Sequence, residues 1–145
     1  MSHVSMRRAA RGLAAAVLML AAATAIHAHH SFAAQYDNNK PTNMTGALTK
    51  LEWTNPHVYI YIDVTDAATK KVTNWAFEMG PPHMLQKTGW KKNSLKIGEV
   101  VTIDGWLARD GSHSANARRV TRKSTGEVMG AASSAGQALA SGTAP

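Results

Sequence analysis

The sequence contains no cysteine, and this absence removes several classes of protein from consideration. Without a thiol the chain can form neither a disulfide-stapled scaffold nor a cysteine-ligated zinc or iron–sulfur site. It also has no cysteine nucleophile, no attachment point for a c-type haem and no residue to carry the lipid of a lipoprotein. Its 145 residues suffice for one domain with its own hydrophobic core and are too few for two.

Catalytic signatures are also missing from the sequence. It has no G-x-S-x-G nucleophile elbow, no glycine-rich phosphate loop and no H-E-x-x-H zinc motif. Asp63, Glu78 and Asp104 all fall on expected strands, but the sequence does not place any two of them at acid–base distance. We therefore predict a protein that is not an enzyme.

The first 28 residues have the three parts of a secretory signal peptide. Arg7, Arg8 and Arg11 form a basic start, and an apolar run from Leu13 to Ile26 ends in small residues. The run of about 14 residues is shorter than the roughly 20 that a membrane-spanning helix needs. Cleavage after residue 28 is favoured, and cleavage after residue 25 is the alternative. We therefore expect a periplasmic or secreted protein without a transmembrane segment once the signal is removed.

The remaining chain is only mildly basic. Three of the 16 Lys and Arg residues belong to the signal, which leaves a formal net charge of about +4. An exported protein meets little nucleic acid, so we expect none as a partner. The basic clusters are expected to be solvated surface: Lys91, Lys92, Lys96, Arg118, Arg119, Arg122 and Lys123.

Alternation of apolar and polar residues predicts a protein made mainly of β-strands. The clearest pattern is in 57–65, where β-branched residues alternate with histidine, tyrosine and aspartate. Strands are expected over 45–53, 57–65, 72–79, 99–108 and 115–121, with one short helix over 83–88. An extended lead-in over 31–42 precedes them. The domain is expected to cover 29–129, and the small, polar segment 130–145 is predicted to be a disordered tail.

Three strands, a short helix and two more strands is the element order of a small five-stranded OB-like barrel. A loosely closed α+β sandwich is the alternative. The barrel is favoured because a closed sheet leaves no free edges.

Several strings also resemble a known family, namely HHSFAAQYD (29–37), TGALTKLEWTNPHVYIYIDV (45–64), NWAFEMG (74–80), GW with SLKIGEVVTIDGW (89–106) and ANARRVT (115–121). The chain is similar to short secreted bacterial proteins of unknown function that begin His-His-Ser-Phe after the signal peptide. The resemblance covers about residues 29–129. It implies an envelope protein with a small β-barrel and no known reaction. Family members often carry Pro-x-x-Leu where this chain has Pro82 to Leu85, so His83 is not carried over as a shared functional residue.

The expected mature start is a candidate copper site. The α-amine and imidazole of His29, together with the imidazole of His30, offer nitrogen ligands of the kind that suit Cu(II). His57, just after the Asn55-Pro56 turn, is the candidate for a further imidazole. The alternatives are a soluble start without bound metal and an oxidative copper enzyme, which no substrate-positioning motif supports. The sequence has no cysteine and no carboxylate at metal-ligand spacing, so nothing in it favours zinc over copper.

The second candidate site is the polar and aromatic face around the strand 57–65. Barrels of this type bind ligands on the face of their second and third strands, where aromatic rings provide stacking surfaces. The candidate ligand-binding residues are Trp53, Asn55, Tyr59 and Tyr61. They would recognise a small organic ligand, a saccharide or a partner protein. The alternative is that these rings only pack, with Trp53 and Tyr59 lying against the lead-in segment.

Overall fold

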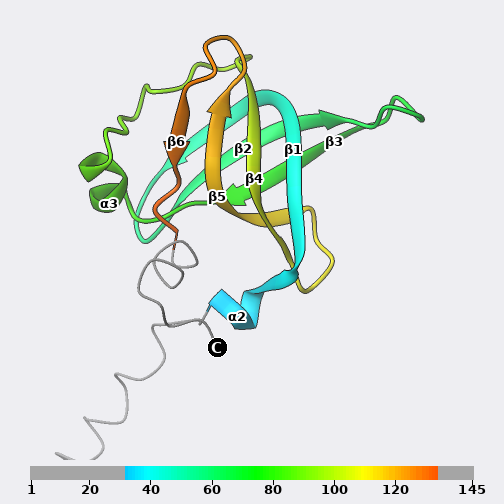
Figure 1. The fold of residues 1–145 in the computed structure, drawn as a ribbon, viewed down its shortest axis with the longest axis horizontal. Coiled ribbons are helices and arrows are strands. Elements are labelled where there is room, and N and C mark those ends of the chain that lie inside the picture. Colours follow the sequence, from blue (N-terminus) through cyan, green and yellow to red (C-terminus); the bar gives the residue numbers. More distant parts are fainter. Residues whose placement is uncertain (1–31, 134–145) are drawn as a thin grey trace, which may run out of the picture. The chain divides into compact units, whose positions relative to one another are not determined.

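The computed structural model describes residues 32–133 and shows a mainly β protein (Figure 1). Among these residues are two short helices and six strands. In chain order they are α2 (Phe32–Gln35), β1 (Tyr36–Trp53), β2 (Val58–Thr65), β3 (Val72–Glu78), α3 (Pro82–Lys87), β4 (Val100–Ala108), β5 (Ser114–Arg122) and β6 (Val128–Gly130). The five strands and the helix expected from the sequence are all present, with shifted boundaries.

The strands form one ring-like sheet. Their order is β3-β2-β1-β4-β5-β6, and each neighbouring pair in this order is antiparallel. An additional parallel pairing, with Phe77 opposite Ala115, connects β3 to β5. The sheet therefore returns to its starting strand, and segments distant in sequence become neighbours.

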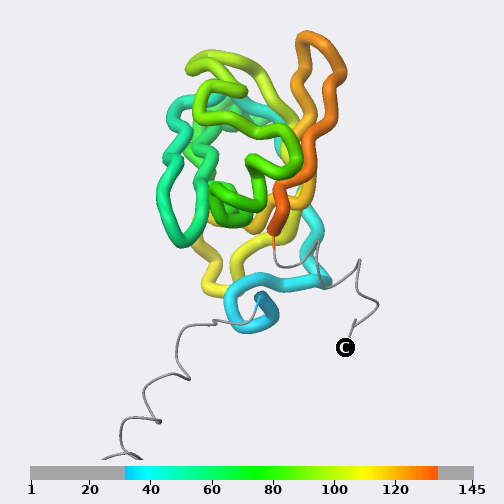
Figure 2. The backbone as a smooth tube through the Cα atoms, turned by 90° about the vertical axis from the view of Figure 1, so that its left-hand side faces the viewer, coloured from blue at the N-terminus to red at the C-terminus, as the bar shows by residue number. Residues whose placement is uncertain are grey.

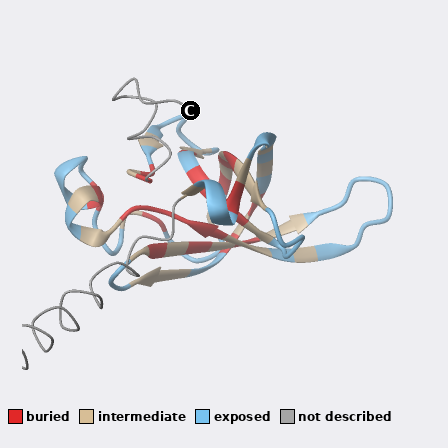
Figure 3. Cartoon of the chain, turned by 90° about the horizontal axis from the view of Figure 1, so that it is seen from below, coloured by how far each residue is buried: buried red, intermediate tan, exposed pale blue. Residues whose placement is uncertain are grey.

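The core lies inside this ring, and the alternation of β2 determines which of its side chains enter it. Val58, Ile60 and Ile62 are fully buried, whereas Tyr59 and Tyr61 lie on the opposite face. The alternation expected for this strand is thus confirmed. Figure 3 shows the buried residues concentrated in the strands, and the β2–β3 turn extending away from them fully exposed.

Strand β1 is much longer than the sequence indicated, because it belongs to two halves of the sheet. Residues 41–47 pair with β4, and residues 47–53 pair with β2. Gly46 lies where the partners change, and a Cβ there would be 2.4 Å from the backbone oxygen of Asp63. The absence of a side chain allows β1 and β2 to approach closely at this bend.

The connection between α3 and β4 contributes to the core, although its sequence is mostly basic. Trp90 and Leu95 are buried, and the indole Nε1 of Trp90 donates a hydrogen bond of 2.8 Å to the carbonyl oxygen of Gly130. This contact attaches the connection to β6.

The prediction of five strands was wrong, because β6 is a sixth strand that pairs with β5. The prediction of a single helix was also incomplete, since α2 precedes β1. The first residues of the expected tail are packed as well: Ala131 is fully buried and donates a backbone hydrogen bond of 3.0 Å to Arg118. Small residues carry little hydrophobic signal, yet they fit where strands approach closely.

Some predictions concern residues outside the described range. These are the signal peptide, the histidines at 29 and 30 and the rest of the tail, 134–145. Within residues 32–133, no helix has the length and apolar character needed to cross a bilayer.

Candidate functional site

A buried carboxylate at the end of β3 gathers three side chains from other parts of the chain. Glu78 accepts hydrogen bonds at Oε2 from the hydroxyl groups of Tyr36 (2.7 Å) and Tyr59 (2.9 Å). His57 Nδ1 lies 2.8 Å from the other carboxylate oxygen, Oε1. We call Tyr36, His57, Tyr59 and Glu78 the Glu78 cluster.

The sheet register places these residues together. Tyr59 of β2 lies directly opposite Glu78 of β3, both on the face that points away from the core. His57 lies in the turn just before β2, and Tyr36 begins β1. The cluster therefore depends on the β2–β3 pairing and on the path of the N-terminal segment.

Burial determines the electrostatics of the cluster. Glu78 is only 7% exposed, and a buried carboxylate is costly unless donors surround it. Burial and the hydrogen bond to Glu78 raise the pKa of Tyr36 well above its ordinary value. Burial and the nearby charge of Glu78 likewise raise the pKa of Tyr59. Both phenols therefore remain protonated donors at neutral pH.

Tyr36, Tyr59 and Glu78 of this cluster form one wall of a pocket of about 500 Å³, and His57 is not among the lining residues. The remaining walls come from α2, from the end of β4 and from the β4–β5 turn. The lining residues are Ala34, Gln35, Tyr36, Tyr59, Glu78, Ala108, Arg109, Asp110, Ser112 and Ser114.

Arg109 holds helix α2 against this pocket. Its backbone N–H donates to the carbonyl oxygen of Gln35 (2.9 Å), and its Nε donates to those of Ala33 (2.8 Å) and Tyr36 (3.1 Å). Phe32 adds an edge-on contact with Trp106, their ring centroids 5.5 Å apart. Figure 2 shows α2 beside the β4–β5 turn. A four-residue helix is thereby fixed as a pocket wall.

The residues predicted for ligand binding occupy different surroundings. Tyr59 lines the pocket, whereas the hydroxyl of Tyr61 donates to the partly exposed Glu52 (3.0 Å) outside it. Trp53 packs partly buried against the core, and Asn55 is exposed in the β1–β2 turn. Tyr59 shares Glu78 with Tyr36 of the expected lead-in segment, which brings the two hydroxyl groups to one carboxylate.

Of the three predicted copper ligands, only His57 lies in the described range. Its Nδ1 is engaged by Glu78, which leaves Nε2 as the nitrogen available to a metal. Residues 32–133 contain no group of three or more His, Asp or Glu side chains arranged to hold a metal ion.

Sequence reasoning did not identify most of the pocket. Glu78 was noted only as a carboxylate on a strand, and Tyr36, Arg109 and Ser114 were not singled out. The available signal was the position of Glu78 between Phe77 and Met79, which places it on the outer face of β3. Its contact with Tyr36 spans 42 residues of sequence, so no local pattern reveals it.

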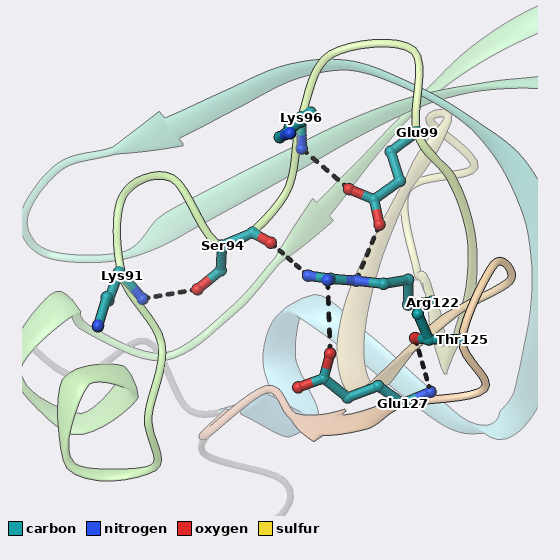
Figure 4. Close-up of polar contacts among 7 residues, drawn as sticks. All are labelled: Lys91, Ser94, Lys96, Glu99, Arg122, Thr125 and Glu127. Carbon is teal, nitrogen blue, oxygen red and sulfur yellow. Dashed lines mark hydrogen bonds and ion pairs between the residues drawn. The ribbon is translucent and has the colours of Figure 1, made fainter.

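Six of the seven basic residues expected as solvated surface are exposed, and only Arg122 is partly buried. Arg122 lies 2.8 Å from Glu99 and 3.5 Å from Glu127, and its guanidinium also donates to the backbone oxygen of Ser94 (Figure 4). Arg119 pairs with Asp104 at 2.9 Å. These ion pairs connect β5 to the segments around it.

The fold and the pocket define a class: a mainly β domain with a ring-like sheet and a polar pocket on its outer face. The model of a family of unknown function, DUF6152, matches residues 16–117, and the chain belongs to that family. A comparison with curated proteins finds no match.

Proposed function

We propose that the protein is a non-enzymatic, exported binding protein that holds a small polar organic ligand in the pocket beside Glu78. The observation that carries this proposal is the buried carboxylate, surrounded by three donors, in the wall of a pocket. Buried charges are costly to a fold, so an arrangement of this kind favours a role in recognition. The pocket volume of about 500 Å³ is in the range that small ligands occupy.

We interpret the domain as an OB-like barrel to which β6 is added. The pairings support this reading, because strands β1-β2-β3-β5-β4 form a ring with β3 parallel to β5 and with α3 between β3 and β4. OB-folds bind ligands on the face of strands two and three and with the loops β1–β2 and β4–β5. The same elements supply the lining residues Tyr59, Glu78 and Arg109 here, and the β1–β2 turn supplies His57, which contacts Glu78.

The proposal is tested by titrating isotope-labelled protein, from residue 29 onward, with hexoses, polyols and amino acids. We expect at least one compound class to shift the amide signals of residues that line the pocket, such as Tyr59, Glu78 and Arg109. A Tyr59→Phe variant is expected to weaken that binding severalfold. If no compound perturbs these signals, or if the shifts map to another face, the proposal is wrong.

Copper binding through His29, His30 and His57 is a second candidate. The observation that favours it is the contact of His57 Nδ1 with a carboxylate, because such a contact commonly orients a metal-binding histidine. We expect tight one-to-one Cu(II) binding with nitrogen hyperfine structure in EPR spectra of a chain that begins at His29. One extra N-terminal residue or a His57→Ala substitution would weaken it, and equal binding in all three chains would contradict this candidate.

A further inference from the structure

We infer that the ligand of the pocket beside Glu78 carries a protonated amine. This inference rests on the proposed function and names the chemical class of its ligand. It follows from the hydrogen bonds that three lining hydroxyl groups already donate and from the charges of the lining residues.

Three of the four lining hydroxyl groups, those of Tyr36, Tyr59 and Ser112, have already used their protons. Tyr36 and Tyr59 each donate their single hydroxyl hydrogen to Glu78. Ser112 donates its own to Asp110 Oδ1 at 2.7 Å. A hydroxyl that donates in this way offers only lone pairs to a ligand. These three groups therefore act only as hydrogen-bond acceptors toward a ligand.

The charges of the lining residues also favour a ligand that donates hydrogen bonds and carries positive charge. Glu78 and Asp110 are carboxylates, and Arg109 is the one cationic side chain among the described lining residues. The Nε of Arg109 is engaged by two backbone carbonyl oxygens, and its Nη2 lies 3.9 Å from the Asp37 carboxylate, which is not a lining residue. Its charge is thus partly offset, and the pocket favours a cation over an anion.

An ammonium group matches both features. It has three donors and no acceptor, and it carries the positive charge that the two carboxylates favour. Tyr36 and Tyr59 also line the pocket, and aromatic rings attract cations. A carboxylate or phosphate ligand would instead meet these lone pairs and two carboxylates, against the single guanidinium of Arg109.

The test compares three sugars of nearly equal size by NMR titration of the chain from residue 29 onward: glucosamine, glucose and glucuronate. We expect glucosamine to bind at the pocket signals, about five- to tenfold more tightly than glucose, and glucuronate to bind more weakly than either. If glucose binds as tightly as glucosamine, or glucuronate binds best, the ligand class is wrong while the pocket proposal stands. If none of the three perturbs the pocket signals, the inferred ligand class is contradicted, whereas the pocket proposal fails only when the hexoses, polyols and amino acids all leave these signals unchanged.

Charge variants separate the pocket from the overall charge of the protein. Glu78→Gln is expected to abolish most of the preference for glucosamine over glucose. Glu52→Gln is the matched control: it removes the same charge from another carboxylate that accepts a tyrosine hydroxyl, outside the pocket. Should Glu78→Gln fail to fold, Asp110→Asn, on the exposed turn, must lower the preference instead. An unchanged preference in the folded variants would overturn the inference.

Discussion

Glu78 concentrates much of the chemistry of this protein at one residue. Three donors from the start of β1, the β1–β2 turn and β2 meet at its carboxylate. Each donor stabilises a charge that would otherwise be buried at a cost of several kcal/mol. The cluster therefore contributes to both the stability of the fold and the shape of the pocket, and substitutions can separate the two roles.

We predict that Tyr59→Phe lowers the free energy of unfolding by about 1.5–3 kcal/mol, because it removes a hydrogen bond to a buried carboxylate. Tyr61→Phe is the matched control, since the Tyr61 hydroxyl donates to Glu52, whose side chain is 35% exposed. The control should lose about 0.5 kcal/mol or less. Chemical denaturation of both variants measures the difference. Equal losses of stability would show that the hydrogen bond to buried Glu78 contributes no more than the one to Glu52.

The pKa shifts of Tyr36 and Tyr59 predict a loss of stability in alkali. Both values are raised above 10.0 in the folded chain. Below that pH the folded and unfolded chains both keep these protons, and the contribution is intact. Above it the unfolded chain releases them first, so the free energy of unfolding falls as the pH rises.

Denaturation midpoints measured between about pH 8 and pH 12 show how steeply the free energy of unfolding falls with pH. The fall should be less steep in Tyr36→Phe than in the unsubstituted protein. Parallel profiles for the two proteins would contradict the assignment to Tyr36.

At the scale of elements, β1 connects the two halves of the sheet, and its bend depends on Gly46. A Cβ at this position would be 2.4 Å from the backbone oxygen of Asp63, and backbone cannot move aside as a flexible side chain can. We predict that Gly46→Ala lowers the free energy of unfolding by about 2 kcal/mol or more.

Gly130→Ala is the control for Gly46→Ala, because a Cβ there meets no atom within 4 Å. It should change stability by about 0.5 kcal/mol or less. Thermal or chemical denaturation of both variants tests the pair. If alanine at position 46 does not lower stability, β1 does not need the close backbone contact with β2 in order to bend.

The sequence predicted elements best where hydrophobic alternation was strong. In β2 every second residue from Val58 to Ile62 is buried, as the pattern indicated. The first half of β1 was predicted only as an extended lead-in, because Asp37 to Lys40 carry no apolar alternation. Residues 41–47 form a strand because they pair with β4, and strand pairing depends on the tertiary structure.

At the scale of the whole molecule, β6 and the residues after it complete the core. Gly130 accepts the hydrogen bond of Trp90, and Ala131 accepts one of 2.8 Å from the backbone of Gly80. We predict that a chain ending at Ser133 keeps the stability of the full chain. A chain ending at Glu127 should lose about 2 kcal/mol or more, since it exposes Trp90 and removes these partners.

Denaturation of the two shortened chains, with identical N-termini, checks this prediction. Equal stability of both would mean that β6 does not contribute to the core. A loss in the chain that ends at Ser133 would instead contradict the expectation of a disordered tail for the part of 130–145 that follows Ser133.

Local patterns were enough to predict a mainly β protein, the approximate places of five strands and a helix, and the alternation that puts Tyr59 on one face of β2. These follow from local patterns of polarity, which a single strand reports without knowledge of its neighbours. Only the tertiary structure decided that β6 joins the sheet, that α2 forms a pocket wall and that Glu78 meets Tyr36. The physical reason is that buried hydrogen bonds and close backbone contacts depend on which segments become neighbours, and sheet closure brings together residues that no local pattern connects.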